Sequence, residues 1–297
     1  MAADRPRHTL DTDALWLDAE RAAALLGPLS LLRPEIGRPG WRQGPHPRRR
    51  EGQGSEFWQY RPLEHGEAAD RVDWRRSGRS DSLYVRTHER ELPARLALWA
   101  EPAPSMDYAS NARAPTKQYR ALVIAAALAL AAEEGGEACA PLGTARPARA
   151  RQVLEQLRAE PMGPLRSAPL APGDTVVLIG DFLEPDRLAA IAPMAAQGAG
   201  GVVVQVADPA EIDFPFEGRV ELVDVAPHAE PRLIDASAAT RARYLEAWAA
   251  HSEAIENAAR LAGWQYLLHR TDSPVQETLA TLAALVGGAK MGGDARR

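Results

Sequence analysis

The run LALWAEPAPSM, from Leu96 to Met106, decides the fold, because five apolar residues lead directly into a short loop that opens with a carboxylate. The apolar residues predict a buried strand over Leu96–Ala100. Two further runs predict strands of the same kind, at Thr175–Ile179 and Gly201–Val206. Long helical segments separate these runs, and strands that alternate with helices indicate a parallel sheet covered on both faces. We therefore expect an α/β protein with a doubly wound, mostly parallel sheet.

Working outward from this run, the remaining elements follow from periodicity and turn residues. The predicted helices are 13–32, 119–134, 148–159, 185–197, 238–262 and 275–286, and the further predicted strands are 56–63, 83–90, 137–142, 219–224, 231–234 and 265–268. The segments 219–224 and 231–234 are expected to form a small hairpin or an extra strand. The alanine-rich helix at 119–134 is apolar on all sides, which predicts that it is buried.

These elements divide the chain into four parts. Residues 1–51 hold a leading helix and a linker rich in proline, glycine and arginine. Residues 52–91 form a β elaboration that we expect to pack on the main domain. The main domain covers residues 92–290, and residues 291–297 are a tail.

The β elaboration carries a dense segment of aromatic and charged residues, GSEFWQYRPLEHGEAADRVDWRRSGRSDSLYVRTHER, from Gly54 to Arg90. Its prominent members are an acid–aromatic pair, a tyrosine–arginine pair, an Asp–Trp pair and two flanking arginines: Glu56, Phe57, Tyr60, Arg61, Asp73, Trp74, Arg71 and Arg79. Acidic residues interleave with the arginines, so we favour an ion-pair network that holds the elaboration in place, with Trp74 buried and Asp73 paired to an arginine. Partner recognition and base stacking by Trp74 on a nucleic acid are the alternatives.

The order of these residues resembles the signature of a bacterial family of uncharacterised proteins, domain of unknown function fifty-eight. That signature places glycine, phenylalanine and arginine ahead of an Asp-Trp pair, followed by a strand and an Asp-x-Ser-x-Ser-Met loop. The resemblance can be followed from about Gly52 to the C-terminal helix. It implies that the sheet domain is of the von Willebrand factor A type. Relatives are typically paired with MoxR-type AAA+ ATPases, so the resemblance also implies such an ATPase as partner.

Domains of the A type hold a metal ion at the ends of their strands, and the resemblance supplies candidates for its ligands. Glu101 stands at the position of the first aspartate, Ser105 at the second serine and Asp181 at the last aspartate, with Thr144 a stand-in for the threonine. Oxygen ligands of this kind suit Mg²⁺. Ala103, however, replaces one hydroxyl ligand, and glutamate is one methylene longer than aspartate. We therefore expect a degenerate site that holds no metal, with Glu101 and Asp181 a strand-end acidic pair that faces water.

Other functional classes find little support in the sequence. The net charge of −5 argues against a nucleic-acid-binding protein. The single cysteine, Cys139, cannot form an internal disulfide, which fits a reducing cytoplasm. The apolar run at 121–132 is too short to span a membrane. The chain also contains no G-x-x-x-x-G-K-[ST], G-x-S-x-G or H-E-x-x-H motif.

One short motif has two interpretations. Asp208-Pro209-Ala210-Glu211 could be a pair of carboxylates for acid–base catalysis, but it is more typical of a helix N-cap, which we favour. The function that we expect is therefore a non-enzymatic, cytoplasmic adaptor that works without a cofactor. A metal-dependent hydrolase that uses Glu101, Ser105 and Asp181 is the first alternative, and nucleic-acid binding is the second. The sequence indicates no oligomeric state.

Overall fold

The computed structural model describes residues 10–31, 51–62, 78, 83–89, 95–111, 114–159, 165, 169–184, 186–222 and 232–287. The chain divides into two compact units, one made of Met1–Arg42 and Ala94–Arg297 and the other of Gln43–Pro93. In the smaller unit, β1 (Glu51–Pro62) and β2 (Tyr84–Glu89) pair antiparallel, with register shifts near Phe57. The two strands predicted in this segment are thereby confirmed.

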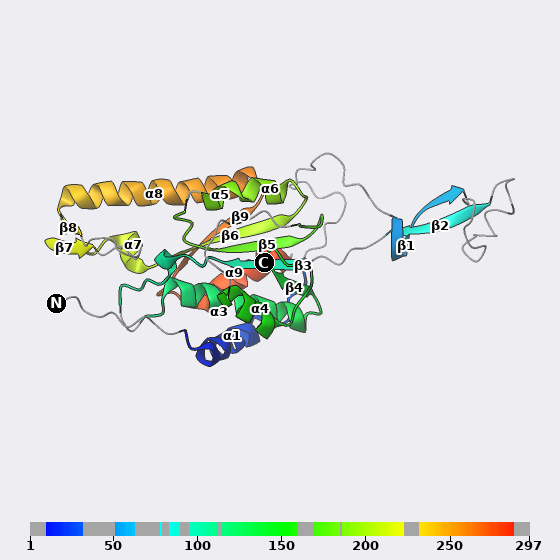
Figure 1. Cartoon of the computed structure of the whole chain (residues 1–297), viewed down its shortest axis with the longest axis horizontal. Coiled ribbons are helices and arrows are strands. Elements are labelled where there is room, and N and C mark those ends of the chain that lie inside the picture. Colours follow the sequence, from blue (N-terminus) through cyan, green and yellow to red (C-terminus); the bar gives the residue numbers. More distant parts are fainter. Residues whose placement is uncertain are drawn as a thin grey trace, which may run out of the picture. The chain divides into compact units, whose positions relative to one another are not determined.

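The larger unit is built on a parallel sheet of five strands (Figure 1). These strands are β3 (Arg95–Ala100), β4 (Ala138–Pro141), β5 (Thr175–Gly180), β6 (Gly200–Ala207) and β9 (Gln265–Arg270). They lie side by side in the order β4-β3-β5-β6-β9, and every neighbouring pair is parallel. Numbered along the chain, this order reads 2-1-3-4-5, one of the common orders of doubly wound sheets. The α/β fold with a central parallel sheet is confirmed.

Helices cover both faces of the sheet, as predicted (Figure 1). One face packs against α3 (Lys117–Glu134), α4 (Ala150–Ala159) and α9 (Val275–Gly287), and α1 (Thr12–Leu26) packs on α3 and α9. The other face packs against α5 (Asp186–Ala189), α6 (Ile191–Ala195) and α8 (Ala238–Leu261). Since side chains alternate along a strand, Leu98 of β3 joins the first core and its neighbour Trp99 joins the second. The helix α3 is buried along most of its length, which confirms the prediction from its apolarity.

Two predicted helices differ from the structure for local reasons. The first helix ends at Leu26 instead of Leu32, because Gly27 adopts a positive φ of 74° and Pro28 follows it. The single helix predicted over 185–197 is two short helices, α5 and α6. Pro193 cannot donate to the carbonyl of Ala189 and its ring collides with that carbonyl, so the helix is interrupted there.

Three small elements complete the larger unit. A 3₁₀ turn, η2 (Pro104–Met106), follows β3, and α7 (Pro209–Asp213) follows β6. The strands β7 (Arg219–Leu222) and β8 (Arg232–Asp235) form the predicted antiparallel hairpin. None of the helices within the described ranges has the length and apolar character needed to cross a membrane.

Candidate functional site

The candidate site lies where the order of the sheet changes direction. From β3 the chain first moves to β4 on one side and then crosses to β5 on the other, so β3 and β5 flank the switch point. Ligands of doubly wound folds bind at the carboxyl ends of the strands at this point. Glu101 is the first residue after β3 and Asp181 the first after β5, and the amide of Glu101 donates to the carbonyl of Ile179 at 2.8 Å. The two carboxylates therefore stand at the ends of adjacent strands.

Both carboxylates are buried, which corrects the prediction that they face water. Glu101 is 1% exposed and Asp181 is 3% exposed. Each is paired with a cation from a helix that the sequence analysis did not connect to the site. Arg187 of α5 binds Glu101, and Lys117 of α3 binds Asp181. We refer to Glu101, Lys117, Asp181, Arg187 and Glu211 as the switch-point cluster.

The extra methylene of Glu101 turns its carboxylate toward Arg187. Its Oε1 accepts from Nε of Arg187 at 3.0 Å, and its Oε2 accepts from the amide of Phe182 at 2.9 Å. The carboxylate passes over Gly180, where a Cβ would lie only 2.3 Å from Oε2, so a side chain at that position would displace it. Burial, and then the charge of Asp181, raise the pKa of Glu101 to about 7 against the opposing effect of Arg187.

Lys117 bridges two carboxylates in a site closed to water. Its Nζ donates to Oδ2 of Asp181 at 2.9 Å and to Oε1 of Glu211 at 2.6 Å, and the side chain is 1% exposed. The ring of Tyr108 lies 5.8 Å from Nζ. Burial on its own would lower the pKa of Lys117, but the charges of Asp181 and Glu211 outweigh it and raise the pKa above 10.5. The amine therefore stays protonated and is not a nucleophile.

Asp208 and Glu211 form the capping box of α7, which confirms the N-cap interpretation of this motif. Asp208 Oδ1 accepts from the amide of Ala210 at 2.8 Å, and Glu211 Oε2 accepts from the amide of Asp208 at 2.9 Å. The other oxygen of Asp208 accepts from the amide of Ser110 at 2.9 Å. Since the same Glu211 binds Lys117, the cap also fixes α7 against the switch-point cluster.

The residues at the switch point do not fit a Mg²⁺ ion. Oδ2 of Asp181 accepts from Lys117 and Oδ1 from the amide of Leu183 at 3.3 Å, while both oxygens of Glu101 are bound to nitrogen donors. Ser105 lies in the turn η2, and the side chain of the buried Ala103 has no oxygen that could bind a metal. No group of three His, Cys, Asp or Glu residues arranged to hold a metal occurs among the residues that the structure describes. The positive charge that a metal would supply comes instead from the Lys117 ammonium.

Thr144 is not part of this end of the sheet, which corrects its assignment as a stand-in ligand. Its carbonyl accepts from Arg95, the first residue of β3, at 2.6 Å. The same guanidinium binds Asp174, which precedes β5, at 2.9 Å. The Thr144 carbonyl therefore lies beside the guanidinium that joins the starts of β3 and β5.

The sequence carried one signal that could have revealed the cluster. Lysine occurs only at positions 117 and 290, while arginine supplies the rest of the positive charge. A lysine retained in such a chain, at the start of an apolar helix, points to a special environment. Nothing comparable marks Arg187 among so many arginines.

The prominent residues of the β elaboration remain untested. Arg71, Asp73, Trp74 and Arg79 lie outside the described residues. Glu56, Phe57, Tyr60 and Arg61 belong to β1, but their side chains are also outside the described part. The ion-pair network and the burial of Trp74 stay predictions.

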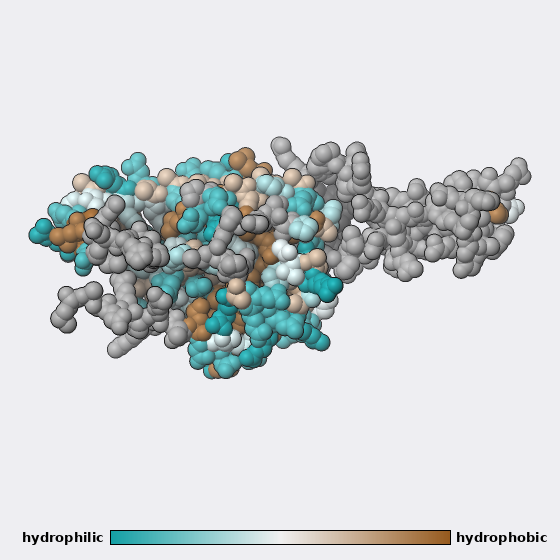
Figure 2. Space-filling view, in the orientation of Figure 1, coloured by the Kyte–Doolittle hydropathy of each residue, from teal (hydrophilic) through white to brown (hydrophobic). Residues whose placement is uncertain are grey.

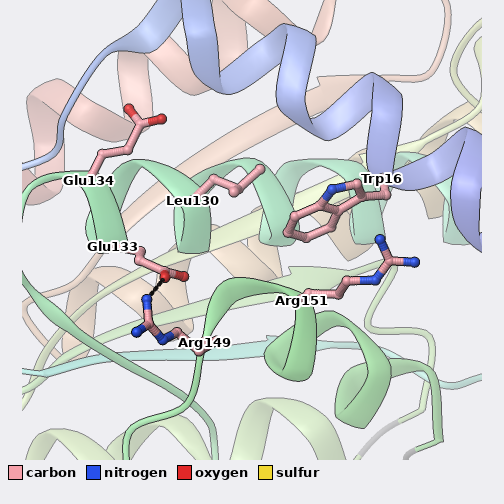
Figure 3. Close-up of a pocket in the computed structure, with 6 residues that line it drawn as sticks. All are labelled: Trp16, Leu130, Glu133, Glu134, Arg149 and Arg151. Atoms are coloured by element: carbon pink, nitrogen blue, oxygen red, sulfur yellow. Dashed lines mark hydrogen bonds and ion pairs between the residues drawn. The ribbon is translucent and has the colours of Figure 1, made fainter.

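A hollow lies between α1, α3 and α4, and none of its lining residues belongs to the switch-point cluster (Figure 3). It is about 350 Å³ in volume and is lined by Trp16, Leu130, Glu133, Glu134, Arg149 and Arg151. Its charged groups largely satisfy one another: Arg149 pairs with Glu133 at 2.6 Å, and Arg151 pairs with Asp13 at 2.9 Å and lies over the ring of Trp16. This arrangement offers no convergent set of unpaired groups for a ligand.

Comparison with known proteins identifies a family. The search of curated proteins and the search of solved structures each found no match. The family model described as "Protein of unknown function DUF58" matches residues 59–152 and 145–254. Together these ranges cover more than half of the 297 residues. The chain belongs to the DUF58 family.

Proposed function

We propose that this protein is a non-enzymatic protein-interaction module, an adaptor for a MoxR-type AAA+ ATPase, and that its α/β unit is of the von Willebrand factor A type. The ATPase and the A-type fold come from the resemblance of the sequence to its family. Their support in the structure is the position of Glu101, Ser105 and Asp181, which follow neighbouring strands of a doubly wound sheet.

One observation carries the proposal: Lys117 occupies the centre of the switch-point cluster. A catalytic or metal-binding carboxylate needs a free lone pair directed at its ligand, and Asp181 and Glu101 direct theirs at Lys117, Arg187 and backbone amides. Both cations of the cluster are thus bound by carboxylates of the cluster itself, and the cluster holds five elements of the fold in one arrangement. Such a rigid, pre-organised end of the sheet suits the binding of a partner protein, since preorganisation lowers the entropic cost of association.

The alternative of a metal-dependent hydrolase finds no support in this donor set. A hydrolase of that kind requires an open coordination position and an activated water. Here the ammonium of Lys117 lies against the carboxylate that would be the last ligand, 2.9 Å from its oxygen.

The test is a binding measurement with the MoxR-type ATPase encoded in the same genome. Purified chain and nucleotide-free ATPase are mixed with 1 mM Mg²⁺ or with EDTA, and binding is followed by light scattering or interferometry. We expect a complex of equal affinity in both buffers, because the switch-point cluster needs no divalent ion. A complex lost in EDTA would contradict the metal-independent site, and the lack of any complex would contradict the proposed partner.

A further inference from the structure

The helix α8 is longer than the sheet that it covers. Its 24 residues span about 36 Å, whereas the six residues of β5 span about 20 Å. The C-terminal end of α8 leads into β9 at the amino edge of the sheet, so the excess length lies beyond the carboxyl edge. At His251 the helix passes the carboxyl edge of the sheet, because Nε2 of this residue lies 2.8 Å from the carbonyl of Asp181, just past β5. Residues 238–250 therefore overhang the switch point, as Figure 1 shows.

Residues 238–250 continue a stripe of apolar side chains that is buried farther along the helix. Ile255 and Ala259 are buried in the core, and Tyr244, Leu245 and Trp248 follow the same face at helical spacing. None of residues 238–250 is buried. The ring of Phe214 contacts Tyr244 with the centroids 4.8 Å apart, which holds one end of the stripe against α7. Large apolar side chains thus remain partly open on the face that elsewhere forms the core.

The turn after β5 carries an exposed apolar side chain two residues from Asp181. Leu183 is 51% exposed, and its amide donates to Asp181, the residue that His251 contacts. Its exposed neighbours Glu184 and Asp186 form no ion pair within the described residues. Arg187 of α5, which follows this turn, is buried and pairs with Glu101.

We infer that Leu183, Tyr244, Leu245 and Trp248, the overhang surface, form the docking site for a partner segment that carries large apolar side chains beside arginine or lysine. The apolar stripe would receive the apolar side chains, and the exposed carboxylates of Glu184 and Asp186 complement a basic segment. The site lies at the switch point, where doubly wound folds bind their ligands. This inference deepens the proposed function, on which it rests for the identity of the partner.

Two variants and one matched control test the overhang surface. Trp248→Ala truncates the stripe, and Leu183→Ser alters an exposed loop residue whose change leaves the core intact. The control is Leu261→Ala, since Leu261 lies at the other end of the same helix and is 81% exposed. Figure 2 shows a hydrophobic patch at this C-terminal end of α8. Circular dichroism and thermal melting establish that each variant is folded.

Each protein is titrated with the MoxR-type ATPase and with a synthetic amphipathic helical peptide of leucine and arginine. A second peptide, with glutamate in place of arginine, tests the preference for charge. We expect both the ATPase and the arginine peptide to bind at least tenfold more weakly to Trp248→Ala and Leu183→Ser, with Leu261→Ala within twofold of the unchanged protein. The glutamate peptide should bind at least tenfold more weakly than the arginine peptide.

The two probes separate the inference from the proposed function. If the ATPase binds all four proteins equally, the overhang surface is not the docking site, although the partner is correct. If the ATPase binds none of them while the arginine peptide still discriminates, the surface stands and the partner is wrong. If the peptides show no preference for charge or for the intact surface, the inference is overturned. Should Trp248→Ala fail to fold, Leu183→Ser decides.

Discussion

At the scale of single residues, the switch-point cluster makes Lys117 the most consequential cation in the described part of the chain. Replacing it by methionine leaves the buried carboxylate of Asp181 and the partly buried carboxylate of Glu211 beside an apolar side chain. Removing one partner of a buried pair typically costs about 3–5 kcal/mol in free energy of unfolding. We expect Lys117→Met to lose stability of this size in urea denaturation.

The control for this variant is Arg21→Met, which removes an ion pair with Asp18 at the surface of α1. Exposed pairs contribute about 0–1 kcal/mol, so the control should remain close to the unchanged protein. The double variant Lys117→Met, Asp181→Asn should recover part of the loss, because it also removes one orphaned charge. Equal stability of Lys117→Met and Arg21→Met would show that Lys117 does not offset the charges of Asp181 and Glu211.

Glu101 gives the cluster a dependence on pH. Its pKa is raised from 4.5 to about 7, first by burial and then by the charge of Asp181. Between these two values the folded protein holds a proton that the unfolded chain has released. The contribution of Glu101 to stability is therefore complete below pH 4.5 and is lost as the pH rises through 7.

The measurement is the difference in free energy of unfolding between the unchanged protein and Glu101→Gln, from pH 5 to pH 8. We expect the free energy of unfolding of the unchanged protein to fall relative to that of Glu101→Gln as the pH rises. The comparison with Glu101→Gln is needed because His269 changes stability in the opposite direction. Burial lowers the pKa of His269 to about 4, so its contribution to stability is lost as the pH falls from 6.5. A difference that stays constant over this range would mean that Glu101 is ionised throughout.

At the scale of elements, the short helix α7 depends on its capping box. Asp208 is fully buried, and it accepts from the amides of Ala210 and Ser110. Asp208→Ala removes the cap, leaves the buried amide of Ala210 without its acceptor and removes the acceptor of the Ser110 amide, so we expect a loss of about 2–4 kcal/mol in free energy of unfolding. Asp208→Asn keeps an acceptor oxygen and should lose less. Ser237→Ala, at the exposed N-cap of α8, is the comparison with a cap near water.

The sequence predicted most of these elements because their signals are local. Continuous apolar runs identified β3, β5 and β6, and the Asp-Pro-x-Glu motif identified the start of α7. The errors were also local, at Gly27 and Pro193, where backbone constraints end a pattern that periodicity would continue.

The site was only half predictable, for a different reason. The strand-end carboxylates Glu101 and Asp181 could be placed because carboxyl ends of parallel strands share one edge. Their partners could not, since Lys117 lies 64 residues from Asp181 and Arg187 lies 86 residues from Glu101. Long-range pairing of charges leaves no periodic trace in a sequence, and the prediction that the carboxylates face water was wrong for that reason.

At the scale of the whole molecule, the response to Mg²⁺ distinguishes a neutralised site from a metal site. An ion bound only by the folded protein at one hundred times its Kd adds about 2.7 kcal/mol to the free energy of unfolding. Because Lys117 and Arg187 already compensate the carboxylates, we expect 1 mM Mg²⁺ to leave the melting temperature unchanged within about 1 °C. A rise of several degrees that disappears in Asp181→Asn would contradict this expectation.

The scarcity of lysine gives the molecule a built-in chemical reporter. Amine-reactive reagents modify only the unprotonated, accessible amine, and the side-chain amines available to them are those of Lys117 and Lys290. While the fold is closed, the burial and the high pKa of Lys117 protect it from acylation. The rate at which mass spectrometry detects a modified Lys117 therefore reports how often the carboxyl end of the sheet opens. Modification of this one residue therefore detects local openings at the carboxyl end of the sheet that leave the rest of the protein folded.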